Sequence, residues 1–189
     1  CNKNKIMQQN ANIQYNGGCE VQSQSLFAHL TSDELELVEK NKVCMTFKKG
    51  DAVFTEGHYP LGLYCIDNGK IKVERSGDEG KKQVVRMVKS GELIGYRALF
   101  CNEQYTASAV AIEDVSLFLV PKAIFFDLVK SNHKITQTII KILAADLRKA
   151  EALITHLAQK PVRERMANTL IFLERKYGYT DDKATLNIQ

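Results

Sequence analysis

A heptad repeat of apolar residues runs through residues 132–159 and constrains the fold of this 189-residue chain more than any other feature. Its members are separated alternately by four and three residues, the spacing of the seam between two helices wound around each other. The sequence therefore predicts a long helix that joins two copies of the chain in parallel. The repeat starts at Thr136, and the expected homodimer interface consists of Ile140, Leu143, Leu147, Ala150, Ile154 and Leu157.

A second apolar row, formed by Ile135, Ile139, Ile142 and Leu153, lies beside this seam. Two rows allow one side of the helix to face a partner helix while the other packs on its own subunit. The alternative is an ordinary amphipathic core helix, which needs neither so regular a seam nor a second row. In either case Pro161 ends the helix, because proline lacks the backbone N–H and disfavours helical geometry in the preceding residue.

The composition, with 44% hydrophobic and 25% charged residues, is ordinary for a soluble protein. A chain of this length supports one core and part of a second domain. Its apolar runs are too short to span a membrane and no signal peptide is readable, so we expect a cytoplasmic protein without membrane contact. The excess of 26 Lys and Arg over 22 Asp and Glu permits DNA binding but is too small to indicate it.

Five cysteines lie far apart in the sequence, with no CxxC pair among them. This spacing argues against a disulfide framework and against a closed zinc site in a cytosolic protein. Cys44 and Cys65 fall in strand patterns and are expected to be small buried hydrophobes. Cys1 and Cys19 lie in a polar segment, where they are either loose surface thiols or part of a redox or iron–sulfur site. Because such clusters generally need four ligands, no cofactor is expected.

Residues 1–24 are rich in Asn and Gln and lack periodicity, which predicts a flexible or loosely docked N-terminal arm. A helix is expected to follow over about Ser32–Asn41. Thr31 and Glu34 have the spacing of a capping box, in which each side chain serves the other's backbone N–H.

From Val43 to Val120 the apolar period changes to two, and turn residues recur about every ten positions. Short strands at this spacing predict an antiparallel sandwich or barrel. Asn68-Gly69 is the clearest hairpin signal, because both residues tolerate the positive φ that tight hairpin turns require. The predicted strands are Cys44–Phe47, Ala52–Thr55, Leu63–Ile66, Ile71–Arg75, Gln83–Val88, Tyr105–Ala111 and Val115–Val120.

The alternation stops between Leu93 and Tyr105, where residues 94–100 predict a helical turn inserted between strands. A small helix whose free N–H groups point into a barrel is suited to bind an anion. Further helices are predicted after Pro121 and over Val162–Tyr177. Asn132 is expected to cap the long helix between them. A helix and the strand-like residues 185–188 cannot bury a core alone, so the last domain is expected to be incomplete.

These features together resemble the Crp/Fnr superfamily of bacterial transcription regulators. The resemblance covers residues 26–189 and depends on the order of several individually weak motifs. The motifs are Phe47–Asp51 with Phe54 and Glu56-Gly57, Gly69 with Ile71–Val73, Gly91–Gly95 with Ala98–Phe100, the long helix, and Val162–Ala167 with Leu170 and Leu173.

The resemblance implies a mainly β protein with α-helices, organised in four segments. Residues 1–24 would be the arm, and residues 25–131 a double-stranded β-helix, or jelly-roll, sensor of the cyclic-nucleotide-binding type. Residues 132–160 would be the dimerisation helix, and residues 161–189 the start of a winged helix-turn-helix domain. The implied partners are DNA, through a region missing from this chain, an unknown small-molecule or redox effector, and RNA polymerase.

The sensor loop departs from the cyclic-nucleotide-binding members that it resembles. In those members a glutamate after the helix glycine holds the ribose hydroxyl, and an Arg-Ser pair ten positions later holds the cyclic phosphate. Here Tyr96 follows the glycine and Thr106-Ala107 replaces the pair, so cyclic AMP is not expected to be the effector. The loop is more similar to members that sense oxygen, nitrogen oxides or redox state. Effector-pocket candidates are Gly95, Tyr96, Arg97, Ala98, Thr106 and Ala107.

Two other functions remain as alternatives. An enzyme is disfavoured because the four histidines are dispersed and no nucleophile elbow, Walker loop or metal-binding pair occurs. A stand-alone cyclic-nucleotide-binding module would not need the residues after Pro161. The sequence thus predicts an effector-sensing, DNA-binding regulator rather than a catalyst.

Overall fold

The computed structural model describes residues 19, 21, 26–77, 80–159 and 161–178. The chain forms two compact units, Cys1–Thr136 and Gln137–Gln189. In the described part of the chain, no helix has both the length and the apolar character needed to cross a membrane.

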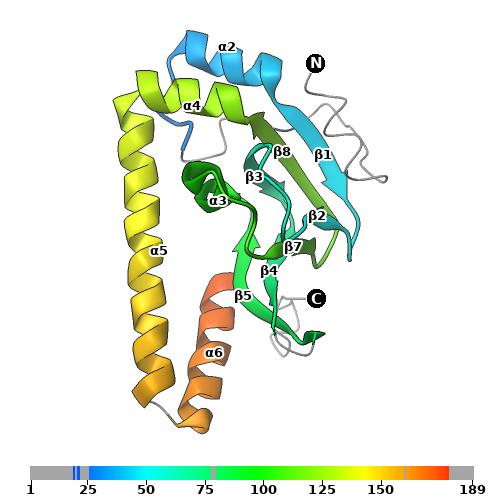
Figure 1. Cartoon of the computed structure of the whole chain (residues 1–189), viewed down its shortest axis with the longest axis vertical. Helices are drawn as coiled ribbons and strands as arrows, with labels where there is room; N and C mark the ends of the chain where they lie inside the picture. The colour runs from blue at the N-terminus through cyan, green and yellow to red at the C-terminus, as the bar shows by residue number, and fades with distance from the viewer. Residues whose placement is uncertain (1–18, 20, 22–25, 78–79, 160, 179–189) are drawn as a thin grey trace. The chain divides into compact units, whose positions relative to one another are not determined.

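The first unit is built on two four-stranded antiparallel sheets (Figure 1). One sheet has the strand order β1-β8-β3-β6 and the other the order β2-β7-β4-β5. The prediction of an antiparallel β sandwich of the jelly-roll kind with added helices is confirmed. Its elements are α2 (Ser32–Asn41), β1 (Val43–Phe47), β2 (Ala52–Phe54), β3 (Gly62–Asn68), β4 (Lys70–Ser76), β5 (Lys82–Lys89), β6 (Leu93–Ile94), α3 (Tyr96–Cys101), β7 (Ser108–Ala111), β8 (Val115–Pro121) and α4 (Lys122–Ser131).

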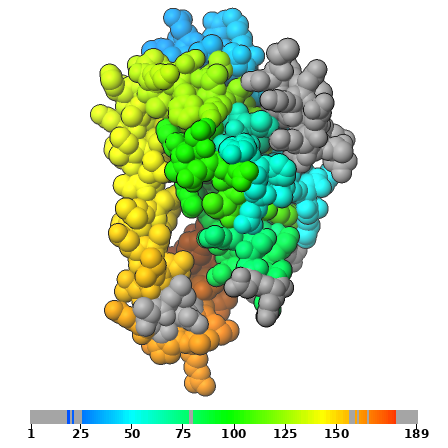
Figure 2. All heavy atoms as spheres, in the orientation of Figure 1, coloured from blue at the N-terminus to red at the C-terminus, as the bar shows by residue number. Residues whose placement is uncertain are grey.

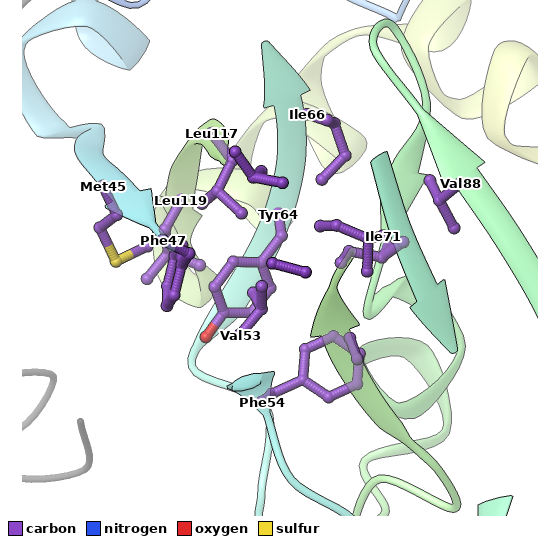
Figure 3. Close-up of a cluster of buried hydrophobic side chains, with 14 of the residues drawn as sticks. Met45, Phe47, Val53, Phe54, Tyr64, Ile66, Ile71, Val88, Leu117 and Leu119 are labelled. Atoms are coloured by element: carbon purple, nitrogen blue, oxygen red, sulfur yellow. The ribbon is translucent and has the colours of Figure 1, made fainter. Parts of the chain in front are cut away.

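The core lies between the two sheets, because the alternating side chains of each strand point inward there (Figure 3). In β1, for example, Val43, Met45 and Phe47 are buried while the residues between them are partly exposed. The other buried core residues are Val53, Phe54, Tyr64, Ile66, Ile71, Val88, Ile94, Tyr105, Ala109, Ala111, Val115, Leu117 and Leu119.

Helices α2 and α4 contact the outer side of the first sheet, through β8 and, for α4, also β3. The central strands of this sheet are therefore buried on both faces, which is why β8 has an uninterrupted buried run at 117–120. Helix α2 has the predicted capping box: Glu34 N donates to Thr31 Oγ1 at 3.3 Å, and Thr31 N donates to Glu34 Oε2 at 2.9 Å. Both predicted ends of this helix are confirmed.

The prediction of a hairpin at Asn68-Gly69 is wrong. The two strands that flank it, β3 and β4, belong to different sheets and do not pair with each other. Gly69 instead lies against backbone of another segment, since a Cβ on it would sit 2.6 Å from the Asp114 carbonyl oxygen. Glycine is required by this close approach and by a φ of 96°, at the point where the chain passes from one sheet to the other. The paired hairpin is β4–β5.

The second unit comprises most of α5 (His133–Gln159) and α6 (Val162–Tyr177). Figure 2 shows side chains standing at the surface along α5 (yellow). Three predicted seam residues, Ile140, Leu147 and Ile154, are 59%, 62% and 66% exposed in the single chain. Ala150 is also exposed and Leu143 is partly exposed, whereas the side chain of Leu157 lies outside the described residues.

Helix α6 also carries large apolar side chains that are exposed. Val162, Met166 and Leu170 recur every fourth residue, so they lie along one side of the helix. With Thr169 they line a surface hollow. Residues 185–188, predicted to begin a strand, lie outside the described part of the chain.

Candidate effector site

Helix α3 interrupts the strands between β6 and β7, where the alternation of the sequence stops. Gly95 is its N-cap residue and has a φ of 88°, a left-handed conformation that side chains disfavour. No side chain caps this end of the helix. The helical turn predicted over residues 94–100 is confirmed as α3, and Gly95 at its N-terminus lies next to buried core side chains.

Aromatic rings occupy the space beside Gly95. A Cβ placed on this glycine would lie 3.4 Å from the Tyr105 hydroxyl oxygen and 3.4 Å from a Tyr64 ring carbon. The ring of Phe54 stacks on that of Tyr105, with centroids 3.9 Å apart, and lies 5.7 Å from that of Tyr64. Phe54 and Tyr64 are both labelled in Figure 3. We call these three rings, Phe54, Tyr64 and Tyr105, the aromatic cluster.

The hydroxyl of Tyr105 is buried and has no hydrogen-bond partner among the residues that the structure describes. Burial raises the pKa of both Tyr105 and Tyr64, so both phenols are neutral at physiological pH. A neutral phenol can donate one hydrogen bond and accept others. The aromatic cluster therefore offers apolar surface and an unused hydroxyl, but no charge.

Tyr96, the residue after the helix glycine, is only 4% exposed. Its hydroxyl accepts a hydrogen bond of 2.5 Å from Arg86 Nη1, and the Arg86 guanidinium carbon lies 5.6 Å from the centre of the Tyr96 ring. Arg86 comes from β5. The tyrosine and the arginine thus tie α3 to the edge strand of the second sheet.

The other candidate residues are less enclosed. Arg97 and Thr106 are exposed, and Ala107 is partly exposed. Ala98 is half-buried and packs against the core. The structure therefore brings Gly95, Tyr96 and Ala98 to the core side of α3, while Arg97 and Thr106 lie at the surface.

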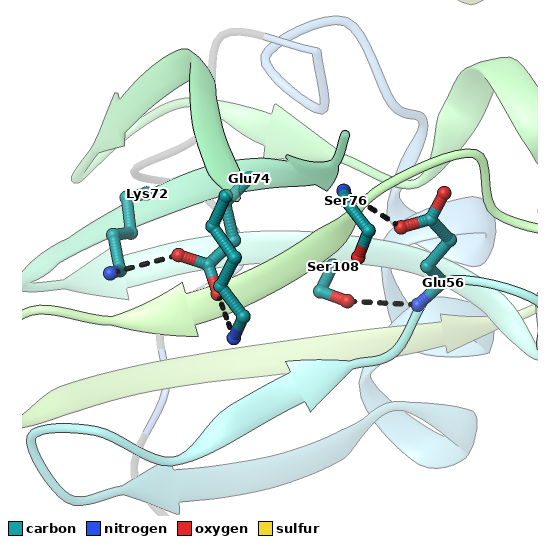
Figure 4. A network of polar contacts seen from close by, with 6 residues as sticks. Glu56, Lys72, Glu74, Ser76 and Ser108 are labelled. Carbon is teal, nitrogen blue, oxygen red and sulfur yellow. Dashed lines mark hydrogen bonds and ion pairs between the residues drawn. The ribbon is translucent and has the colours of Figure 1, made fainter. Parts of the chain in front are cut away.

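A polar network lies on β4 and its neighbours (Figure 4). Glu74 is 4% exposed and forms ion pairs with Lys82 at 2.7 Å and Lys72 at 2.9 Å. Hydrogen bonds from these two ammonium groups hold the pKa of Glu74 below its ordinary value. Glu56 joins the same region, because its carboxylate accepts from Ser76 N at 3.1 Å and its own N–H donates to Ser108 Oγ at 3.0 Å.

Sequence reasoning missed Arg86 and the aromatic cluster. Arg86 had a readable signal, since it stands two residues before the buried Val88 and so shares its face of β5. The aromatic cluster had none, because Phe54 and Tyr64 come from different sheets and meet only where the two sheets pack on each other.

Within the described residues, no three His, Cys, Asp or Glu side chains are grouped so that they could hold a metal ion. Cys19 is buried, and Cys1 lies outside the described part of the chain.

Comparison with known proteins relates this site to a sensor domain. Residues 44–132 match the family described as the cyclic nucleotide-binding domain. The cyclic AMP receptor protein of Thermus thermophilus is 26% identical over 151 residues, which cover 80% of this chain and 70% of that protein. The fumarate and nitrate reduction regulatory protein of Vibrio cholerae is 26% identical over 170 residues, covering 86% and 68%. The chain belongs to the Crp/Fnr superfamily.

A solved structure agrees with this assignment at the level of the fold. A protein assigned to the transcriptional regulators of the crp/fnr family from Eubacterium rectale has a TM-score of 0.72 and 18% identity, covering 83% of this chain and 74% of that one. The Crp/Fnr relatives are regulators rather than enzymes, and the predicted effector-sensing regulator is confirmed over the stand-alone module. This Crp/Fnr chain spans about two thirds of the length of the curated relatives it matches.

Proposed function

We propose that this Crp/Fnr chain senses an effector other than cyclic AMP. The observation that carries the proposal is that buried aromatic side chains, Tyr96 and the aromatic cluster, surround the N-terminus of α3. A cyclic phosphate keeps a full negative charge when it is buried, and its lost hydration must be replaced by charged hydrogen bonds. Each bond to a charged group contributes about 1.5–3 kcal/mol.

The residues at the proposed site supply little of this compensation. Thr106 offers one neutral hydroxyl and is exposed, and Ala107 has no side-chain donor. Arg97 is exposed, and the Arg86 guanidinium is engaged with Tyr96. Losing two charged hydrogen bonds would lower the affinity by about three orders of magnitude, at about 1.4 kcal/mol per factor of ten. An uncharged effector that packs on rings and bonds the Tyr105 hydroxyl suits this site better.

Isothermal titration of the purified chain with cyclic AMP and with cyclic GMP tests the proposal. We expect no saturable heat at micromolar nucleotide. The Arg86→Ala and Arg97→Ala variants should behave like the unsubstituted chain. Micromolar binding that either substitution abolishes would show that the cyclic phosphate binds that arginine, and would contradict the proposal.

We propose also that the chain acts as a homodimer through α5. The exposed apolar seam of Ile140, Leu147 and Ile154 supports this, since three large apolar side chains in heptad register are suited to bury against a symmetry mate.

DNA recognition is proposed to use residues that follow α6. Base readout requires an element that enters the major groove. About a third of each relative's length lies outside the match and can supply such an element. We therefore expect residues 1–189 alone to bind DNA only weakly, with a steep dependence on salt. RNA polymerase is a further proposed partner of the complete regulator.

A further inference from the structure

Two cysteines meet on the outer side of the first sheet, away from the effector site. Cys44 lies in β1, and its Cα partner across the pairing with β8 is Phe118. The Cys19 thiol donates a hydrogen bond to the carbonyl oxygen of Leu117, the residue before that partner, at 3.6 Å. The Cys44 side chain lies beside this thiol, since it is among the neighbours that raise the pKa of Cys19. Both cysteines are free.

The backbone at Cys19 is held in this position. The Lys42 ammonium, just before β1, donates to the Cys19 carbonyl oxygen. The same ammonium lies 5.6 Å from the centre of the Phe118 ring. Cys19 is 8% exposed and Val21 is 1% exposed, so both described residues of this stretch are buried. These contacts place Cys19 next to the start of β1 and next to β8.

The other described cysteines are placed where Cys44 cannot bridge to them. Cys65 pairs with Phe118 from the opposite side, so the whole of β8 separates it from Cys44. Two strand spacings amount to about 9.5 Å, whereas a disulfide needs Cα atoms within about 6.8 Å. Cys101 lies on α3, beyond β6 in the chain order, and is exposed. Cys19 is the cysteine that the structure places beside Cys44.

The two thiols differ in how far they are exposed. Cys44 is half-buried, whereas burial, followed by the Cys44 side chain beside it, raises the pKa of Cys19 to about 12. Because the thiolate is the reacting form and the raised pKa of Cys19 keeps that thiol protonated, the less buried Cys44 is the better placed of the two to meet an oxidant. Cys19 is then the resolving thiol, already beside Cys44.

We propose that Cys19 and Cys44 form a reversible disulfide when a peroxide oxidises the chain. The Cys44 thiolate attacks one peroxide oxygen, the O–O bond breaks, and the products are a Cys44 sulfenic acid and water. The Cys19 sulfur then attacks the Cys44 sulfur, and a second water leaves. Two thiols lose two electrons and two hydrogens, and one peroxide becomes two waters. The bond covalently joins the segment at residue 19 to the sensor domain.

Mass spectrometry of the full chain after treatment with hydrogen peroxide tests this site. The five cysteines fall in five different tryptic peptides, with Cys19 in residues 6–40 and Cys44 in residues 43–48. We expect an intact mass lower by two hydrogens and a cross-linked pair of these two peptides. Dithiothreitol should restore both the mass and the two separate peptides.

Single variants identify the partners. In Cys44→Ser we expect Cys19 to remain a free thiol that alkylates after denaturation. In Cys19→Ser we expect Cys44 to proceed to sulfinic acid, because no resolving thiol is present. The matched controls Cys65→Ser and Cys101→Ser should keep the 6–40 to 43–48 link. Circular dichroism tests whether each variant is folded. If Cys44→Ser does not fold, Cys44→Ala takes its place in the experiment.

Two results would overturn the proposal. One is a link that joins Cys44 to a cysteine other than Cys19. The other is overoxidation of Cys44 at equal rates in the unsubstituted chain and in Cys19→Ser. The inference does not depend on the effector of the sensor pocket, so a cyclic nucleotide that binds would leave it standing.

Discussion

Two tyrosine hydroxyls at the effector site differ in their hydrogen bonding. The Tyr96 hydroxyl accepts from a charged guanidinium, whereas the Tyr105 hydroxyl is buried without a partner. A buried polar group without a bond costs about 1–3 kcal/mol, and a bond to a charged group contributes about 1.5–3 kcal/mol. Removing the two hydroxyls should therefore have opposite effects on the free energy of unfolding.

We predict that Tyr105→Phe stabilises the sensor domain by about 1 kcal/mol and that Tyr96→Phe destabilises it by about 1.5 kcal/mol or more. Urea unfolding followed by near-ultraviolet circular dichroism measures both. Each variant controls for the other, since both remove one phenolic oxygen next to α3. Loss of stability in both would mean that the Tyr105 hydroxyl has a partner in solution.

Glu74 links the stability of the sensor domain to pH. Hydrogen bonds from Lys82 and Lys72 lower its pKa from the ordinary 4.5. A carboxyl whose folded pKa is lowered stabilises the fold above the unfolded value and loses that contribution as the pH falls through the folded value. We predict that Glu74→Gln costs about 1–3 kcal/mol at pH 7 and less as the pH is lowered below 4. A cost that stays constant from pH 7 to pH 3 would contradict this.

Residue types alone identified part of the site. Gly95 and Tyr96 were found because the alternation of the sequence stops there, and the absence of arginine at 106 and 107 was visible directly. The aromatic cluster was not predictable, because β2 and β3 lie in different sheets and their rings meet only where the sheets pack on each other. Cys44 was expected to be a buried hydrophobe, yet it is half-buried and contacts a thiol 25 positions earlier in the chain.

At the scale of elements, Asn132 joins three helices. It is the C-cap of α4, and its side-chain oxygen accepts from the N–H groups of Lys134 and Ile135 at 3.0 and 3.2 Å, which caps α5 as predicted. Its side-chain nitrogen donates to Glu34 Oε2 of α2 at 2.8 Å. The side chain of Asn132 thus bonds α5 and α2, and its backbone N–H donates to the Leu128 carbonyl oxygen of α4.

We predict that Asn132→Ala destabilises the sensor domain by about 1–2 kcal/mol, the usual cost of losing a helix cap. Asn132→Ser should recover part of this loss, because a hydroxyl can still accept from the first turn of α5 but is too short to reach Glu34. Thermal unfolding of the three proteins compares them. Equal stability of the alanine variant and the unsubstituted chain would show that water replaces the cap.

The elements themselves were largely predictable, since α2 and α6 match their predicted bounds and all seven predicted strands form. The pairing of those strands was not. Asn68-Gly69 has the chemistry of a hairpin turn, but here the same positive φ serves a passage between sheets. A turn motif reports local backbone conformation, whereas sheet membership depends on which distant strands bury a common core.

At the scale of the whole molecule, the central claim is that α5 joins two copies of the chain. The heptad predicts the seam, and the single chain leaves three of its large apolar residues more than half exposed. The sequence predicts which residues a partner would cover, but a single chain cannot contain the partner. The dimer therefore remains a prediction for solution measurements.

Sedimentation equilibrium of the chain and of Leu147→Lys tests this claim most directly. The substitution places two like charges across a dry seam, where burial without a counter-charge is costly. Ala152→Lys is the matched control, because it adds the same charge at an exposed position of α5 outside the seam. We predict a dimer for the unsubstituted chain and for Ala152→Lys, and a monomer for Leu147→Lys. A monomeric unsubstituted chain, or a dimer that Leu147→Lys leaves intact, would contradict the account.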